Sequence, residues 1–370
     1  METLHGLPQP HNTTEPALRD VRPLPLPGPS PEAQARPPGV PCPRRIEQRR
    51  EKVVRYLTPD EYALWDKLVS TSPQGTIFCQ SWWLSAISGE VRLLGYFGGQ
   101  HLIAGIPLYF EKRLGVDLCT IPPLTQTWGV MIEPLVGKEV SKASRELEIL
   151  GAIANRLSEQ SIFFQAFHPS FRNWLPFQWR GFKQTTRFTY VLDDLSSADV
   201  IWQGMRHQMR TEIRKAERLG LTITTCDIAT VFRTGQELYR RRGVKQPFTF
   251  EYLHRIYAAA RQNNAAECFA AQDRAGKIHA ANLLVWDSKK SYYLAGARDP
   301  ETFTTGAQAL LIWHMIQFAA TRTRAFDFEG SVLAGVERFF RGFGAKRIPY
   351  SLIMKFPLWL RLYLILIRKI

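Results

Sequence analysis

The sequence contains few cysteines and no arrangement of them that would hold a metal ion. Its 370 residues include five cysteines, and no two form a Cys-x-x-Cys pair. The eight histidines form neither a His-Glu-x-x-His motif nor a pair four residues apart. These absences argue against a zinc site and against a disulfide-stapled secreted domain, so we predict no metal. An odd number of scattered cysteines is typical of proteins from a reducing compartment.

A long hydrophobic run is also missing. No apolar run of signal-peptide length lies near the start of the sequence. Residues 357–370 are strongly apolar, but Arg361 interrupts this short run, which is too brief for a spanning helix. Its Trp359, Tyr363 and basic flanks favour a helix lying on a membrane surface, and packing against the folded domain is the alternative. We therefore expect a cytoplasmic protein, at the inner face of the membrane if this basic amphipathic tail binds lipid.

Acidic residues are outnumbered by basic ones. The 33 Asp and Glu residues oppose 48 Lys and Arg residues, which gives a net charge of +15 and a pI near 9.8. Such a chain is attracted to nucleic acid, to an anionic membrane surface or to a phosphorylated substrate. Charge alone does not choose among these, and a basic soluble protein with none of these partners is the plain alternative.

Prolines are concentrated at the start of the sequence, and the pattern of the remaining residues predicts the same order of helices and strands twice. Twelve of the 24 prolines lie in residues 1–45, so we predict that residues 1–50 form a disordered tail. Residues 51–195 predict two helices, a β-meander, a helix, a strand, a loop or short helix, and a final strand. Residues 196–356 repeat that order, and Arg-Gly-Phe precedes the last strand of each half, at 180–182 and 341–343. The sequence thus predicts a mixed α/β fold made of two tandem copies.

A phosphate-binding turn is predicted in the second half. Residues 291–296 are typical of a strand, and after a polar loop Thr305 and Gln308 have the spacing of a capping box that opens a helix to about residue 320. Backbone N–H groups at such a helix start can hold a phosphate. The candidate cofactor-binding residues are Arg298, Thr305, Gly306 and Ala307.

A row of arginines is the strongest candidate for substrate binding. Arg206, Arg210 and Arg214 recur every fourth position on a predicted helix, which keeps them broadly on one side. Guanidinium groups projecting together suit phosphate or pyrophosphate, and a solvated face paired with Glu212 and Glu217 is the alternative.

Three further residues are candidates for substrate binding. Tyr239 and Arg241 end another helix, where a cation also favours the helix dipole for purely structural reasons. Trp128, in a loop of the first half, is predicted either to wall the cleft or to pack in the core.

Glu329 is the candidate general base. It ends a predicted strand between two phenylalanines and a Gly-Ser turn, and Asp327 lies on the same face. The alternative is a structural carboxylate paired with a nearby arginine. Tyr293 is a candidate donor to a developing oxyanion, or a core residue. The first half lacks these carboxylates, so we place the chemistry in the second half and expect the first half to help form the acceptor cleft.

Four strings in this order carry a family resemblance, over about residues 55–356. They are Met-Arg-Thr-Glu-Ile-Arg-Lys-Ala-Glu-Arg-Leu-Gly at 209–220, Tyr-Arg-Arg at 239–241, Phe-Asp-Phe-Glu-Gly-Ser at 326–331 and Phe-Phe-Arg-Gly-Phe-Gly at 339–344. The chain resembles the GNAT acyltransferases, and its second half is similar to the Fem-type and BioF2-like acetyltransferases among them.

The resemblance implies tandem GNAT-like domains and transfer of an acyl or aminoacyl group to an amine. The co-substrate would be acyl-CoA or aminoacyl-tRNA, with no tightly bound cofactor, and both donors remain open. We expect the acceptor to be a cell-envelope or polysaccharide precursor, that is, a phosphate-bearing small molecule or a lipid-linked substrate. The alternative function is a non-catalytic protein that binds RNA, including tRNA, or a membrane surface through its arginine row.

Overall fold

The computed structural model describes residues 51–113, 115–302, 305–330, 333–358 and 360. The predicted tail at 1–50 and nearly all of the one at 357–370 lie outside the described residues. Within the described part of the chain, no helix is both long enough and apolar enough to cross a bilayer.

The predicted repeat of elements is confirmed. The first half contains β1 (Lys52–Tyr56), η1 (Pro59–Glu61), α1 (Tyr62–Thr71), η2 (Ile77–Cys79), α2 (Ser81–Ala86), β2 (Glu90–Gly98), β3 (His101–Arg113), β4 (Val116–Thr120), β5 (Met131–Ile132), α3 (Glu139–Leu157), β6 (Phe163–Ala166), α4 (Leu175–Gln178) and β7 (Lys183–Leu192). The second half contains α5 (Ala198–Gly204), α6 (His207–Arg218), β8 (Thr222–Thr225), α7 (Ile228–Arg241), α8 (Phe250–Gln262), β9 (Ala266–Gln272), β10 (Ile278–Trp286), β11 (Ser291–Arg298), α9 (Ala307–Ala320), β12 (Phe326–Asp327), α10 (Ala334–Arg341) and β13 (Lys346–Lys355). From β1 and from β8 onward, both halves run strand, two α-helices, three strands, helix, strand, helix, strand, if the two-residue strand β5 and the 3-10 helices η1 and η2 of the first half are set aside.

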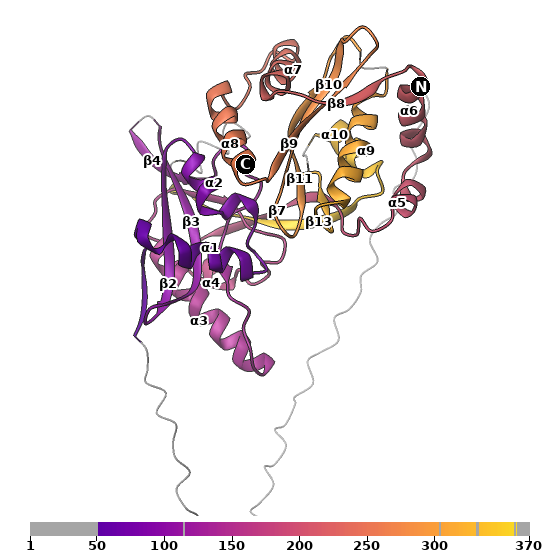
Figure 1. Ribbon diagram of the computed structural model, residues 1–370. Coiled ribbons are helices and arrows are strands. Elements are labelled where there is room, and N and C mark those ends of the chain that lie inside the picture. Colours follow the sequence, from indigo (N-terminus) through magenta and orange to yellow (C-terminus); the bar gives the residue numbers. More distant parts are fainter. Residues whose placement is uncertain (1–50, 114, 303–304, 331–332, 359, 361–370) are drawn as a thin grey trace, which may run out of the picture. The chain divides into compact units, whose positions relative to one another are not determined.

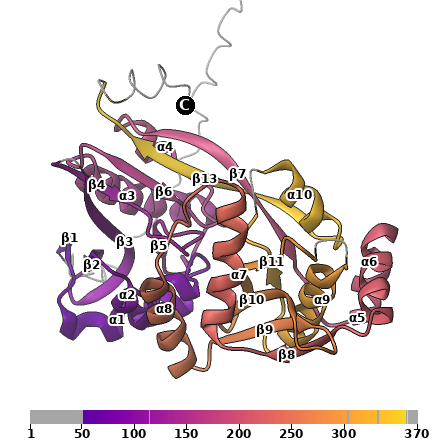
Figure 2. The ribbon, with the colours of Figure 1, turned by 90° about the horizontal axis from the view of Figure 1, so that it is seen from above.

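One continuous sheet joins the halves, because they exchange their last strands. The sheet order is β1-β2-β3-β4-β6-β13-β7-β12-β11-β10-β9-β8, with β5 paired to β3 outside this path. Thus β13 lies beside β7 (Figure 1), between β7 and β6 of the first half (Figure 2). In turn, β7 pairs with β12 of the second half. The halves are therefore not separable bodies, and a single compact unit contains both.

Helices cover both faces of the second-half sheet. Side chains of α7 and α8 share one core cluster with Leu283 and Val285 of β10, whereas α6 and α9 share another with Leu284. Successive strand residues face opposite sides of a sheet, so the two helix pairs lie on opposite faces, as Figure 2 shows. Helix α9 is apolar on more than one side and mostly buried.

Candidate active site

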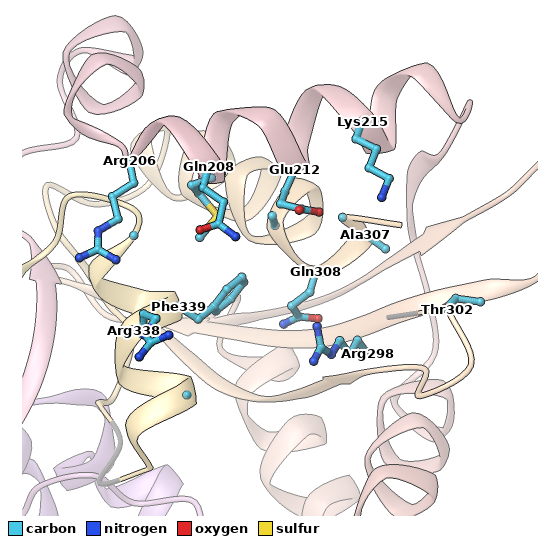
Figure 3. Close-up of a pocket in the computed structure, with 15 residues that line it drawn as sticks. Arg206, Gln208, Glu212, Lys215, Arg298, Thr302, Ala307, Gln308, Arg338 and Phe339 are labelled. Carbon is cyan, nitrogen blue, oxygen red and sulfur yellow. The ribbon is translucent and has the colours of Figure 1, made fainter. Parts of the chain in front are cut away.

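A pocket of about 380 Å³ lies between α6, α10 and the start of α9 (Figure 3). Its lining residues are Arg206, Gln208, Met209, Glu212, Lys215, Arg298, Thr302, Gly306, Ala307, Gln308, Ala309, Gly335, Arg338, Phe339 and Gly342. Four of these side chains are cationic and one, Glu212, is a carboxylate. The pocket therefore favours an anionic ligand, and arginine forks and a helix start suit phosphate groups.

Only part of the arginine row reaches this pocket. Arg206 lines it, together with Lys215 from the same helix. Arg210 instead donates from Nη1 to the carbonyl oxygens of Trp202, Gln203 and Met205, at 3.2, 2.9 and 2.8 Å. Arg214 lies over the Trp202 ring, 5.5 Å from its centroid. The row drifts around α6 with each step, so Arg210 and Arg214 hold α5 rather than line the pocket.

The start of α9 forms as a different cap from the one predicted. Gly306, not Thr305, is the N-cap, with φ at 75°, and no side chain caps the helix. The Thr305 hydroxyl donates to the Thr302 carbonyl at 2.8 Å. The Gln308 amide donates instead to Tyr293 and to Asn282, each at 3.2 Å. The capping box was therefore a wrong prediction, because strand residues engage the glutamine. Arg298, Gly306 and Ala307 line the pocket, and Thr305 does not.

Replacing Gly306 with alanine is expected to damage both the fold and the pocket. A Cβ there would lie 2.2 Å from the Glu212 carbonyl oxygen, and the φ of Gly306 is one that side chains disfavour. We expect a loss of at least about 1–3 kcal/mol of unfolding free energy, measured by denaturant titration. Gly335→Ala is the matched control, because Gly335 also lines the pocket but has open space around its Cβ position. Equal stability of the two variants would contradict the prediction.

Strand β11 has an open edge next to this pocket. It pairs with β12 only at Ser291 and Tyr292, although it remains paired with β10 as far as Arg298. From Tyr293 onward, no β12 pairing covers the β11 edge among the described residues. Backbone N–H and C=O groups on such an edge can bind an extended chain that carries amides.

The corresponding gap in the first half is filled by the chain itself. Strands β4 and β6 pair only at Cys119 and Phe163, and beyond them Trp128 bridges to Phe167. The Trp128 backbone N–H donates to the Ala166 carbonyl at 2.7 Å, and its ring N–H donates to the Phe78 carbonyl at 2.9 Å. Trp128 is buried in the core, so it does not wall either pocket described here. The gap between the two diverging strands is thus open in the second half, whereas the Trp128 segment fills it in the first half.

Tyr293 lies between the large pocket and a smaller one. Its hydroxyl accepts a hydrogen bond from Gln308, which lines the large pocket, and Tyr293 itself lines a recess of about 160 Å³ together with Tyr239. Burial raises the pKa of the Tyr293 phenol, and the nearby Tyr239 and Glu329 raise it further. This phenol therefore keeps its proton at neutral pH, so its hydroxyl can donate a hydrogen bond to a ligand while it accepts one from Gln308.

Glu329 has a buried oxygen without a partner. Oε1 is out of contact with solvent and forms no hydrogen bond, although the residue as a whole is partly exposed. Burial, with a smaller contribution from Asp327, raises the pKa of this carboxyl well above its usual range. The backbone at Glu329 is left-handed, with φ at 59°, so β12 ends at Asp327 and not at Glu329 as predicted. The expected arginine partners are not engaged with it: Arg341, for example, pairs with Glu337.

Asp327 is fully occupied by hydrogen bonds. Its Oδ1 accepts from the Thr189 hydroxyl at 2.5 Å, from the Gln126 amide at 3.3 Å and from the Glu329 backbone N–H at 2.9 Å. Its Oδ2 pairs with Lys290 Nζ at 3.1 Å. Asp327 therefore positions Glu329 and does not itself offer a free base.

The remaining candidates lie outside the large pocket. Tyr239 lines the recess, whereas Arg241 forms ion pairs with Glu237 at 2.7 Å and with Glu301 at 3.0 Å, which tie α7 to the loop before α9. Lys215, Gln308 and Arg338 line the pocket but were not predicted as site residues from the sequence. Lys215 was visible beside the arginine row, but no sequence signal placed Arg338 opposite it.

Gly306 lines the large pocket and Glu329 does not, but Tyr293 lies close to both the start of α9 and Glu329. Glu329 is close enough to raise the Tyr293 pKa, and Tyr293 bonds to Gln308 in the first turn after Gly306. Among the described residues, no group of three His, Cys, Asp or Glu side chains could hold a metal ion.

Comparison with known proteins identifies the class. Residues 203–341 match the family model described as an acetyltransferase (GNAT) domain. This segment spans α6 to α10, which includes the large pocket, the open β11 edge and Glu329. Residues 203–341 thus form a GNAT-type acyltransferase domain, within a chain that has a tandem GNAT-like fold.

Solved structures show the same fold over both halves. FemX is 15% identical, with a TM-score of 0.62, and the alignment covers 81% of this chain and 96% of FemX. L-PGS from Bacillus licheniformis is 13% identical, with a TM-score of 0.51 and coverage of 85% and 98%. The C-terminal domain of an Agrobacterium fabrum protein assigned as a lysylphosphatidylglycerol synthetase is 12% identical, with a TM-score of 0.51 and coverage of 83% and 95%. A comparison with curated protein sequences gave no match.

Proposed function

We propose that the protein transfers an acyl or aminoacyl group directly from a phosphate-bearing donor to an amine of a cell-envelope or polysaccharide precursor. The observation that carries this proposal is the four-cation pocket at the α9 start, beside the open edge of β11. GNAT domains use acyl-CoA as co-substrate, and the pocket's chemistry suits its pyrophosphate as well as the last phosphodiester of an aminoacyl-tRNA.

Donor phosphates would bind to Arg206, Arg298 and Arg338, near the first N–H groups of α9. The chain leading to the reactive carbonyl would then run along the β11 edge, whose backbone groups can bond its amides. The carbonyl would then lie near Tyr293, whose retained proton could stabilise the oxyanion of the tetrahedral intermediate.

The acceptor amine must lose a proton as it attacks the carbonyl. Glu329 Oε1 has an unused lone pair, and its raised pKa makes it a stronger base than an ordinary glutamate. The new amide bond forms as the bond to the thiol or the ribose oxygen breaks, and the leaving group takes up a proton. No covalent enzyme intermediate is required.

The acceptor would bind on the first-half side of Glu329. Burial raises the pKa of Tyr350 in β13, and the nearby charges of Glu329 and Asp327 raise it further. The exchanged strand β13 therefore borders the base. The fold shared with a domain described as part of a lysylphosphatidylglycerol synthetase supports a lipid-linked acceptor. The test is incubation with panels of acyl-CoA and aminoacyl-tRNA and candidate amines, with product mass as the readout. If donors bind but no product forms with any combination of donor and amine, the proposed acyl transfer is wrong.

Loss of one pocket cation is expected to weaken donor binding. Arg338→Met removes a guanidinium from the pocket wall, and we expect the Kd of the donor to rise roughly tenfold, since a charge-assisted hydrogen bond contributes about 1.5–3 kcal/mol. Arg341→Met, on the same helix, is the control, because Arg341 pairs with Glu337 and does not line the pocket. Isothermal titration with coenzyme A measures both, and equal affinities would contradict the prediction.

The alternative function is binding of RNA or a membrane surface without catalysis. The observation in its favour is that α6 also exposes His207, Arg214 and Arg218 outside the pocket. Steep salt dependence of RNA or vesicle binding that persists in Glu329→Gln, without turnover, would support this function.

A further inference from the structure

A recess of about 160 Å³ borders the open edge of β11 on the side of α7. Phe232, Phe248 and other apolar side chains line part of it, and Tyr239, Tyr293 and Gln246 are among the residues that line it with polar groups. At ~30 Å³ per water this space holds about five non-hydrogen atoms, which is the size of a short acyl chain and not of a whole substrate.

Gln246 gives the recess a specific chemical preference. Its carbonyl oxygen Oε1 is out of contact with solvent and has no hydrogen-bond partner. Buried carbonyl oxygens are almost always paired, and an unpaired one is unfavourable. A ligand that brings an N–H or O–H group into the recess would supply the missing donor.

The position of the recess favours the donor's acyl group as its occupant. It is bordered by residues 293–296 of β11, the segment that continues beyond the last pair with β12. Tyr293 connects it to the phosphate pocket through Gln308. Glu329 does not line the recess, so the amine that gives its proton to Glu329 approaches from elsewhere.

We infer that this recess receives the substituent next to the reacting carbonyl, and that Gln246 selects acyl groups bearing an amino or hydroxyl group over those without one. This inference rests on the proposed function, because it assumes a donor in the large pocket. The selected chemistry is a short acyl group with one hydrogen-bond donor, carried by either coenzyme A or tRNA.

Matched ligand pairs test the selection in binding as well as in turnover. For coenzyme A the pair is 3-hydroxybutyryl-CoA and butyryl-CoA, which differ by one hydroxyl. For the tRNA end the pair is the 5′-phosphate of 3′-amino-3′-deoxyadenosine acylated at its 3′-amine with glycine or with acetate, and the two ligands differ by one amino group. In whichever pair binds, titration calorimetry on the full chain should show that the member with the hydroxyl or amino group binds more tightly, on the order of tenfold. The pair that binds identifies the carrier.

Two variants separate selection from loss of structure. Within each ligand pair, Gln246→Leu is expected to bring the ratio of the two Kd values near one, because it improves binding of the member that lacks the hydroxyl or amino group. Gly235→Ala adds a methyl to the recess wall, where its Cβ would lie 3.4 Å from Gln246 Nε2, and should weaken the four-carbon ligands while keeping the ratio. A ratio near one in the wild type, or an unchanged ratio in Gln246→Leu, would overturn the inference. An effect of Gln246→Leu on the KM of the amine alone would also overturn it. Selective binding without turnover would sustain the inference and reject the proposed transfer.

Discussion

Replacing Glu329 with glutamine is expected to lower kcat by roughly 10²–10⁴-fold, the usual contribution of a positioned general base. Glutamine has nearly the same shape but cannot take a proton from the attacking amine. Donor affinity should stay within a factor of two, because Glu329 does not line the phosphate pocket. Steady-state kinetics and donor titration on the same preparation check both parts. A kcat close to that of the wild type would remove Glu329 from the mechanism.

The same substitution should change the pH dependence of stability. Burial raises the pKa of Glu329, so the folded chain holds this proton where the unfolded chain has lost it. Wild-type stability should therefore fall as the pH rises above the ordinary glutamate pKa towards the raised one, and Glu329→Gln should remove this loss. At neutral pH the variant is expected to unfold at a higher temperature than the wild type.

Glu237→Gln is the control for that experiment. Hydrogen bonds from Arg240 and Arg241 lower the pKa of Glu237 to about 2, which is the opposite direction. Its stability contribution is present above the ordinary pKa and is lost only as the pH falls towards 2. Glu237→Gln should therefore leave both kcat and the neutral-to-alkaline stability profile unchanged.

The sequence predicted elements wherever the local pattern was strong. The two helices α7 and α8 followed by the three strands β9 to β11 agree with the predicted order, since apolar periodicity and turn residues define these elements. The strands β1 and β8 were missed, because each is a short edge strand whose alternation is weak. The exchange of β7 and β13 between halves could not be predicted either, because strand partners depend on contacts distant in sequence.

Site residues were predictable by type but not by direction. The base candidate Glu329 and the glycine at the α9 start follow from local sequence. Which arginine of a row meets a pocket depends on the neighbouring helix, and α5 captures Arg210. Two backbone hydrogen bonds show which residues of the halves correspond. Phe167 N–H donates to the Ser351 carbonyl, and Phe328 N–H donates to the Tyr190 carbonyl, so Phe167 matches Phe328 just as Tyr190 matches Ser351. The next residue after each phenylalanine is His168 in the first half and Glu329 in the second, so these two also correspond. Burial lowers the pKa of His168 to about 3, with Lys290 and Lys289 adding to the effect, so the first half carries a neutral group there.

Replacing Asp327 with asparagine is expected to reduce stability by about 3–5 kcal/mol, the usual cost of breaking a buried ion pair from one side. Asn keeps an oxygen for Thr189, Gln126 and the Glu329 N–H, so the main loss is the pair with Lys290. The Lys290 ammonium, whose side chain is only 18% exposed, would remain as a charge without its carboxylate. Urea unfolding measures the change. Asp193→Asn is the matched control: its pair with Lys346 is 58% and 65% exposed, so we expect a change of at most about 1 kcal/mol.

The double variant Asp327→Asn with Lys290→Met separates the ion pair from the position of Glu329. Removing both charges should restore most of the lost stability, because a buried pair contributes little beyond its own desolvation. Activity should recover along with stability if Asp327 acts only by accepting the Glu329 N–H, which asparagine can still do. If stability returns while kcat stays low, the negative charge of Asp327 itself sustains the raised pKa of Glu329, and the rising limb of the pH–rate profile should then lie at lower pH.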